Sequence, residues 1–410
     1  MRVLMVNNLL FPQGEAGTYT VEVGRKLSEM GHTVEYFGMF DRRNVVGSSD
    51  KCCMTNAGVE EDAPRKFHPL GTVYSFEAKK KLSALIEVFE PDIIHINDIN
   101  FSLTPSVTDA AATYGIPVVQ TVHDYAMVCP NRRLFDFRQE QICEKCLGGG
   151  SFSCIKNKCV HDSMKESIVR AVESRVYRIL PNYKKIDRFI CPSRFLEQKL
   201  LSSRPGVFGT KTEVLPYCAE ESAVDPVWLD AEKKLRIKYL LFAGEFDSDE
   251  SVVIFAGTAK RLPDVRFVAA TREEEAFKGL KNITCVGPLS GKPLRELTAR
   301  ATMFFAPAVR YDSMTRAVRN AVSLGTPVIC SDIGSLSELV ENGKTGIPVK
   351  NNSDVGFANA LRGVMTDDKA LSTMFRNCIA SRNGKNGLAE YCEKLLEVYE
   401  NVLSGTDEQN

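Results

Sequence analysis

The sequence predicts an α/β protein with two doubly wound domains, each built around a parallel sheet. The first half of the 410-residue chain alternates strand-like and helix-like segments, and a second such series begins near Tyr239. Strands that alternate with helices are typical of β-α-β units, whose strands pair in parallel. A proline- and charge-rich segment at 216–238 separates the two series, which favours two domains over one.

Each element is predicted from its apolar pattern. Short apolar runs indicate strands, and apolar residues spaced three or four apart indicate helices. In the first half, this predicts strands at 3–6, 33–37, 92–96 and 117–122, and helices at 18–30, 76–89 and 103–114. In the second half, it predicts strands at 239–243, 265–270, 283–286, 303–306 and 327–331, and helices at 251–261, 294–301 and 315–324. A last helix is predicted at 389–403, followed by a tail, 404–410, that we expect to be disordered.

These elements predict the domain boundaries. We expect a first domain at 1–215, a linker at 216–238, a second domain at 239–385, and a C-terminal segment at 386–410 that packs back on the first domain. Ligands of open parallel sheets bind outside the carboxyl ends of the strands. Two such domains joined by a hinge therefore predict a ligand in the cleft between them.

The composition excludes some classes of function. Lys plus Arg and Asp plus Glu both number 52, so the formal net charge is zero. No global field then favours nucleic acid or an anionic membrane. The 44% of hydrophobic residues can fill two cores, but no apolar run approaches the roughly 20 residues needed to span a bilayer. Because Arg2 is followed at once by a short buried strand, we expect no secretory leader and a cytoplasmic protein.

The most informative segment runs from residue 307 to residue 340. A strand that ends near Ala306, a loop, and a helix that begins near Thr315 present backbone N–H groups at a helix N-terminus, which suit a phosphate. Acidic or amide side chains in such a loop can accept hydrogen bonds from sugar hydroxyls. Together these features suit a ligand that carries both a phosphate and hydroxyl groups.

The second half of this segment, LGTPVICSDIGSLSELV, resembles the sugar-donor signature of the retaining glycosyltransferases of family four, or group 1. Weaker matches follow the same order over about 1–403: a glycine-containing loop at 14–17, a helix end at 27–34, and motifs at 91–95, 122–125 and 192–195. The resemblance implies the GT-B fold, in which two Rossmann-like domains face each other across a cleft. It also implies that the first domain binds the acceptor and the second binds the nucleotide sugar.

Two acidic positions of the family are altered here. In the family, a Glu-x7-Glu pair frames the sugar site, with the first glutamate on the sugar and the second on the ribose. Asp312 aligns with the first and Asn320 with the second. The resemblance implies a catalytic-site role for Asp312, which keeps the charge on a shorter arm. Asn320 loses the charge and keeps one hydrogen-bond acceptor.

The basic positions that neutralise the leaving diphosphate in the family are reversed in charge. Glu245 and Glu250 stand where the family has an Arg and a Lys. Loss of one preorganised charge partner costs about 10²–10³ in rate, and a reversal should cost more. Either Arg310, Arg316 and Arg319 compensate, or the site has decayed. The ordinary interpretation of these arginines is a solvated surface.

His123 is the predicted catalytic residue of the first domain. It follows the strand predicted at 117–122, so it lies at a carboxyl strand end. In the family, this histidine lies beside the donor sugar and supports transfer through hydrogen bonds; the alternative is a loop histidine that caps the next segment. His32 and His95 are expected to be structural.

The residues that the resemblance implies for binding of the sugar donor come from loops at strand ends and from the helix predicted at 315–324. They are Gly14, Glu15, Gly17, Gly244, Glu245, Glu250, Leu289, Arg310, Ser313, Met314, Thr315, Arg316 and Asn320.

A cysteine cluster, C-x2-C-x7-C-x4-C, predicts a metal centre. Its members are Cys143, Cys146, Cys154 and Cys159, and four thiolates at such spacing can close a tetrahedral zinc site. Cys129 and His161 are alternative ligands. Disulfides, an iron–sulfur cluster and free thiols are the other hypotheses. One subgroup of the family carries a similar insert, which here spans 129–161.

The sequence therefore predicts a retaining glycosyltransferase that moves a sugar from a nucleotide-diphosphate sugar to a glycan or a lipid-linked acceptor. We expect structural zinc, no catalytic metal and no nucleic-acid partner. The alternative is a catalytically inactive GT-B subunit that binds and stabilises an active transferase. A GT-B epimerase or phosphorylase fits the motifs less well. Lysines at 79–81 and 184–185 would allow peripheral contact with the inner face of a membrane, although the ordinary interpretation of these lysines is a solvated helix surface.

Overall fold

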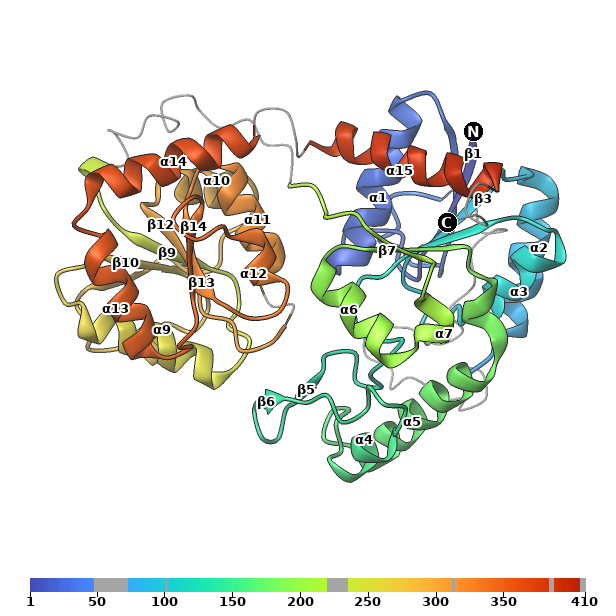
Figure 1. Cartoon of the computed structure of the whole chain (residues 1–410), viewed down its shortest axis with the longest axis horizontal. Helices are drawn as coiled ribbons and strands as arrows, with labels where there is room; N and C mark the ends of the chain where they lie inside the picture. Colours follow the sequence, from blue (N-terminus) through green and yellow to red (C-terminus); the bar gives the residue numbers. More distant parts are fainter. Residues whose placement is uncertain (48–72, 101, 220–234, 312–313, 383–386, 406–410) are drawn as a thin grey trace. The chain divides into compact units, whose positions relative to one another are not determined.

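The computed structural model describes residues 1–47, 73–100, 102–219, 235–311, 314–382 and 387–405 (Figure 1). The chain divides into two compact units. Unit 1 comprises Met1–Leu134, Cys143–Tyr217 and Tyr391–Asn410, and unit 2 comprises Phe135–Ile142 and Cys218–Glu390. Most of the predicted linker, and the end of the tail predicted to be disordered, lie outside the described residues.

Unit 1 is built on a six-stranded parallel sheet with the order β2-β1-β3-β4-β7-β8. Its strands are β1 (Arg2–Val6), β2 (Thr33–Phe37), β3 (Ile93–Ile96), β4 (Val118–Thr121), β7 (Arg188–Cys191) and β8 (Thr212–Val214). Every residue of β3 and β4 is buried. Such burial on both faces is typical of parallel strands that are covered by helices.

The helices of unit 1 lie between these strands in the chain. They are α1 (Gly14–Glu29), α2 (Phe76–Phe89), α3 (Ser106–Thr113), α4 (Phe152–Lys156), α5 (Met164–Ile179), η1 (Pro181–Lys185), α6 (Arg194–Ser203) and α7 (Pro205–Phe208). A last helix, α15 (Leu388–Ser404), belongs to unit 1 from Tyr391 on. Figure 1 shows α15 alongside α1, and the rings of Tyr391 and Tyr19 join these two helices.

Unit 2 has a second six-stranded parallel sheet, with the order β11-β10-β9-β12-β13-β14. Its strands are β9 (Leu240–Ala243), β10 (Phe267–Ala270), β11 (Ile283–Cys285), β12 (Met303–Ala306), β13 (Val328–Ser331) and β14 (Gly346–Val349). Its helices are α9 (Asp249–Arg261), η3 (Glu274–Phe277), α10 (Gly291–Arg300), α11 (Thr315–Ser323), α12 (Leu336–Leu339), α13 (Asp354–Val364) and α14 (Asp368–Arg382).

Alternate side chains of the unit 2 strands enter two cores. Phe242 and Phe305 pack with residues of α9 and α13 in one core, whereas Leu241 and Phe304 pack with residues of α11 and α12 in the other. This alternation follows from the two-residue period of a strand. The sheet is therefore sandwiched between two helical layers, and the predicted doubly wound fold is confirmed in both units.

Two features differ from the predicted elements. Helix α1 begins at Gly14, four residues before the predicted start, because residues 14–17 form a first turn that has no apolar stripe. A short antiparallel hairpin, β5 (Phe135–Asp136) and β6 (Gln141–Ile142), belongs to unit 2 although it lies within the predicted cysteine-rich insert. Phe135 is buried in a core of unit 2, which accounts for this assignment.

Each sheet has one point at which the strand order reverses. In unit 1 this point lies between β1 and β3, and in unit 2 it lies between β9 and β12. Loops that leave the sheet in opposite directions open a crevice at such a point, where ligands of this class of fold bind. Among the described helices, none is long and apolar enough to cross a bilayer.

Candidate functional site

The loops at the reversal point of unit 1 are held together by two consecutive asparagines, Asn7 and Asn8. Asn7 follows β1, and its Oδ1 accepts a hydrogen bond of 2.8 Å from the backbone N–H of Asp98, which follows β3. The backbone N–H of Asn8 donates to the carbonyl oxygen of Asp98 at 2.7 Å. These bonds fix the polar residues of the β3 loop at the carboxyl edge of the sheet.

His123 lies two residues beyond the end of β4 and is partly buried. Its Nε2 lies 2.9 Å from Oδ1 of Asn97, and its Nδ1 lies 2.6 Å from the hydroxyl of Tyr217. Burial lowers the pKa of His123 to about 4, although the nearby carboxylates of Glu15 and Asp98 act in the opposite direction. The imidazole is therefore neutral at physiological pH, and both of its nitrogens have protein partners.

An arginine holds two carboxylates beside this histidine. Arg132 donates from Nε to Asp124 at 2.6 Å and from Nη2 to Asp98 at 2.9 Å. Burial lowers the pKa of Arg132, but Asp124 and Asp98 together raise it above its ordinary value. Asp124 also accepts a bond from the backbone N–H of Ala126. The carboxylates that flank His123 are thus fixed and neutralised, so they are poor candidates for proton transfer.

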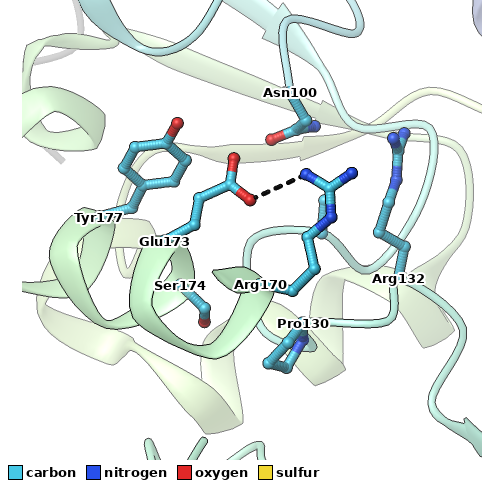
Figure 2. Close-up of a pocket in the computed structure, with 8 residues that line it drawn as sticks. Asn100, Pro130, Arg132, Arg170, Glu173, Ser174 and Tyr177 are labelled. Atoms are coloured by element: carbon cyan, nitrogen blue, oxygen red, sulfur yellow. Dashed lines mark hydrogen bonds and ion pairs between the residues drawn. The ribbon is translucent and has the colours of Figure 1, made fainter. Parts of the chain in front are cut away.

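A small pocket adjoins this arginine on unit 1 (Figure 2). Arg132, Glu173 and Tyr177 line it together with Asn100, Ala126, Pro130, Arg170 and Ser174. Glu173 is 3% exposed, and its Oε2 accepts a bond of 3.2 Å from Arg170. The Tyr177 side chain also interacts with this carboxyl group, whose Oε1 is buried. Burial raises the pKa of Glu173 to about 7, against the opposing effect of Arg170. The pocket thus contains a buried carboxyl group beside Arg170 and Tyr177.

The first loop meets the same carboxyl edge. Gly14, with φ of +66°, begins α1, and a Cβ at Gly17 would lie 2.6 Å from the carbonyl oxygen of Phe11. Only glycine therefore fits position 17 without a shift of the backbone. Glu15 is partly buried and near enough to His123 to influence its pKa. The structure thus brings Glu15 and His123, both predicted from the sequence, into one neighbourhood.

Asp247, which no sequence motif indicates as a site residue, holds the loops at the reversal point of unit 2. Asp247 follows β9, and its Oδ2 accepts bonds from the backbone N–H groups of Val309 (3.0 Å) and Arg310 (3.2 Å), which follow β12. The Asp247 side chain is 2% exposed. Its role resembles that of Asn7 in unit 1. Only its place in the loop after a predicted strand could have indicated it.

Glu245 and Glu250 are both exposed. Between them, Phe246 stacks on Phe242 with ring centroids 3.7 Å apart, so the loop turns its aromatic side chain into the core. Ser248 caps α9 by accepting a bond from the backbone N–H of Ser251. Glu250 lies in the first turn of α9, where a negative charge is stabilised by the helix dipole. Two acidic side chains thus occupy the edge where the family places positive charge.

The predicted loop between β12 and α11 is described only in part, because Asp312 and Ser313 lie outside the described residues. Met314 has φ of +61° and precedes α11, whose first turn contains Thr315 and Arg316. Asn320 is partly buried in the same helix, and Leu289 packs against one core of unit 2.

The Arg310 side chain has two partners within unit 2, Asp247 and Phe137. Its Nε lies 3.8 Å from Asp247, and its guanidinium lies 5.7 Å from the ring centroid of Phe137. Gly244, with φ of +123°, forms the sharp turn at the end of β9.

The cysteine cluster gives no support to the predicted zinc site. Cys146 and Cys154 are buried and pack with Val160, against which Cys159 also packs. Burial raises the pKa of Cys146 to about 12, as expected for a thiol packed among apolar side chains. In the part of the chain that the structure describes, no group of three or more His, Cys, Asp or Glu side chains is arranged to hold a metal ion. Within the described residues, no disulfide joins Cys143, Cys146, Cys154 or Cys159.

Two family models match the chain. Residues 16–217 match the model described as Glycosyltransferase Family 4, and residues 237–367 match the one described as Glycosyl transferases group 1. The chain belongs to this glycosyltransferase family.

Similar proteins agree with this membership. The UDP-Gal:alpha-D-GlcNAc-diphosphoundecaprenol alpha-1,3-galactosyltransferase of Escherichia coli is 23% identical over 353 residues, which cover 83% of this chain and 84% of that protein. A glycosyltransferase structure from Rickettsia africae has a TM-score of 0.65 at 15% identity and covers 98% of each chain. Alr3699/HepE of Anabaena in complex with UDP has a TM-score of 0.63 at 14% identity, over 98% of this chain and 100% of that chain. At these identities the structures establish the GT-B fold alone.

Proposed function

We propose that this protein transfers a sugar from a nucleotide-diphosphate sugar to a glycan or a lipid-linked acceptor, with retention of configuration. The observation that carries the proposal is the placement of His123, a neutral imidazole with both nitrogens bound, at the carboxyl edge of the unit 1 sheet. A neutral, oriented imidazole suits a reaction in which the leaving phosphate takes the proton of the acceptor and the histidine positions the reactants through hydrogen bonds.

The acceptor is proposed to be bound by unit 1. The pocket lined by Glu173, Arg170 and Asn100 combines a buried carboxyl group with guanidinium and amide groups, which suit the hydroxyls of a sugar. The Escherichia coli relative acts, by its name, on a sugar linked through a diphosphate to undecaprenol. This relation favours a lipid-linked acceptor and peripheral contact of the cytoplasmic protein with the inner face of a membrane.

The sugar donor is proposed to be bound at the reversal point of unit 2. Asp247 holds the loop after β12 against the loop after β9, and the N-terminal turn of α11 follows the β12 loop. Asp312, Ser313, Met314, Thr315 and Asn320 would contact the sugar and the ribose, and Arg316 would face the diphosphate. Arg310 would act through the loop that Asp247 holds.

The exposed acidic pair favours a second candidate function. Glu245 and Glu250 would repel a diphosphate at this edge, so a catalytically inactive subunit that stabilises an active transferase is the alternative. The two functions differ in whether the purified chain turns over a sugar donor by itself.

The test is release of nucleoside diphosphate from UDP-, GDP-, ADP- and dTDP-hexoses in the presence of a short lipid diphosphate-linked sugar. We expect one donor to be consumed, the product to keep the anomeric configuration in its NMR spectrum, and His123→Gln to lower kcat by about 10²-fold or more. Consumption of no donor by the wild type, together with turnover by Glu245→Arg/Glu250→Lys, would support the inactive subunit instead.

A further inference from the structure

Tyr217 contacts His123 in two ways. Its hydroxyl lies 2.6 Å from Nδ1 of His123, and the two rings stack with centroids 5.7 Å apart and an interplanar angle of 11°. Tyr217 is the last residue of unit 1 before the chain enters unit 2 at Cys218. No sequence motif indicates this residue, because 94 positions separate it from its partner.

The partners of the imidazole define its tautomer. Oδ1 of Asn97 can only accept a hydrogen bond, so Nε2 of His123 carries the proton. In a neutral ring, Nδ1 is then the acceptor and the Tyr217 hydroxyl is the donor. Burial keeps the ring neutral, and the other charged groups that act on it are Glu15, Asp98 and Arg132.

The ring of Tyr19, on α1, packs against the rings of both His123 and Tyr217. Its ring centroid lies 5.1 Å from that of His123 and 5.7 Å from that of Tyr217. Its hydroxyl lies 2.8 Å from the hydroxyl of Tyr391 on α15, which is the first residue of unit 1 when the chain returns from unit 2. Tyr19 is 6% exposed and Tyr391 is 4% exposed. Because these rings are buried and packed together, they restrict movement of the Tyr217 side chain away from the imidazole.

We propose that Tyr217 is a positioning residue for sugar transfer, whose hydroxyl fixes His123 as the Nε2–H tautomer while its ring, backed by Tyr19, holds the plane of the imidazole. The role in transfer rests on the proposed function, whereas the tautomer does not. With both nitrogens bound, His123 presents a fixed dipole and offers no lone pair to an acceptor proton.

The proposal is tested first on the wild-type chain by nitrogen NMR of a sample labelled in its histidines. The signals of His123 are identified by their loss in His123→Gln. We expect a neutral ring protonated at Nε2 from pH 5.5 to 8, a window of roughly one to four pH units above the lowered pKa. A ring protonated at Nδ1, or a mixture of tautomers, would overturn the proposal without any variant of Tyr217.

Tyr217→Phe then removes the hydroxyl and keeps the stacked ring. A hydrogen bond donated to Nδ1 favours the neutral form, so its loss raises the pKa of His123, by about one unit. Tyr114→Phe is the matched control, because it removes a hydroxyl that donates to Glu87 on the surface, and it should leave the pKa of His123 unchanged. An unchanged pKa in Tyr217→Phe would refute the positioning role.

Kinetics separate this proposal from the proposed function. In an active enzyme, Tyr217→Phe should lower kcat by roughly tenfold with little change in the KM for the sugar donor, because the hydroxyl orients a group and does not bind substrate. Loss confined to KM would contradict positioning. If the wild type proves to be the inactive subunit, the proposed function fails, and the NMR measurements still decide whether Tyr217 fixes the tautomer of His123.

Discussion

Two buried ionisable side chains of unit 1 have pKa values shifted in opposite directions. His95 is fully buried between the hydroxyls of Tyr399 and Thr121, and burial lowers its pKa to about 3. Burial raises the pKa of Glu173 to about 7. Both shifts favour the neutral form, as expected where a charge must leave water. His95 is thus a structural residue of the core, whereas Glu173 opens onto a pocket.

Glu173→Gln should change the pH dependence of stability. The folded-state pKa of Glu173 is above its unfolded value, so its contribution is fully present below about pH 4.5 and is lost as the pH rises to about 7. The free energy of unfolding of the variant, relative to wild type, should therefore increase by roughly 3 kcal/mol between pH 4.5 and 7.5. Urea titrations of both proteins across this range measure the difference, and a flat difference would contradict the burial of an ionisable carboxyl.

His95→Gln is a control, because its effect on the pH dependence of stability should have the opposite sign. The folded-state pKa of His95 is below its unfolded value, so the contribution of the neutral ring is present above about pH 6.5 and is lost as the pH falls toward 3. In the same titrations, the stability of this variant relative to wild type should increase as the pH falls. A slope of the same sign as that of Glu173→Gln would contradict the burial of one of the two groups.

The functional role of a single residue could be predicted only where a local sequence pattern indicates it. His123 follows an apolar strand, and strand ends of parallel sheets carry functional groups, so its position was predictable. Asn97, Arg132, Glu173 and Tyr217 were not predicted, because each acquires its role from residues distant in the chain. Asn97 and Tyr217, for example, meet on the same imidazole.

Among the elements, α9 shows how acidic residues can stabilise the N-terminus of a helix. Ser248 caps the helix by accepting from the backbone N–H of Ser251, and Ser251 returns a hydrogen bond to the backbone of Ser248. Asp249 and Glu250 lie in the first turn, where their charges complement the dipole. These residues stabilise α9 without any bound phosphate.

Ser248→Ala should lower the free energy of unfolding by about 1 kcal/mol, the usual cost of a lost N-cap. Ser290→Ala is the matched control in unit 2, since Ser290 precedes α10 and its side chain makes no capping hydrogen bond. Its replacement should cost only a few tenths of a kcal/mol. Equal losses in the two variants, measured by urea unfolding, would contradict the assigned cap.

Element positions were predictable where the apolar pattern is strong. The helix predicted at 76–89 and the strand at 303–306 have the observed bounds, because buried faces set both patterns. The early start of α1 and the placement of the hairpin β5–β6 depend on contacts that no local pattern contains. The cysteine spacing predicted zinc, and this prediction finds no support in the described residues, where Cys146 and Cys154 pack with Val160.

At the scale of the whole molecule, the two units share one construction. Each has a six-stranded parallel sheet with one reversal of strand order, and in each a polar side chain after the first strand binds the loop on the other side of the reversal. Asn7 does this in unit 1 and Asp247 in unit 2. The repeated rhythm of the sequence predicted the two sheets, but it could not predict these links.

The central claim is that unit 2 binds a nucleotide sugar despite its acidic edge. Thermal unfolding of the wild type and of Glu245→Arg/Glu250→Lys should be compared with UDP-, GDP-, ADP- and dTDP-sugars. Glu393→Arg/Glu397→Lys is the matched control, because both glutamates are exposed on α15 of unit 1 and change the net charge equally.

The account predicts that one nucleotide sugar raises the melting temperature of the wild type and of the control. At 100 times the dissociation constant, the ligand should add about 2.7 kcal/mol of stability. A rise in the melting temperature of Glu245→Arg/Glu250→Lys alone, with none in the wild type or the control, would contradict the account. It would indicate that Glu245 and Glu250 prevent binding of the nucleotide sugar.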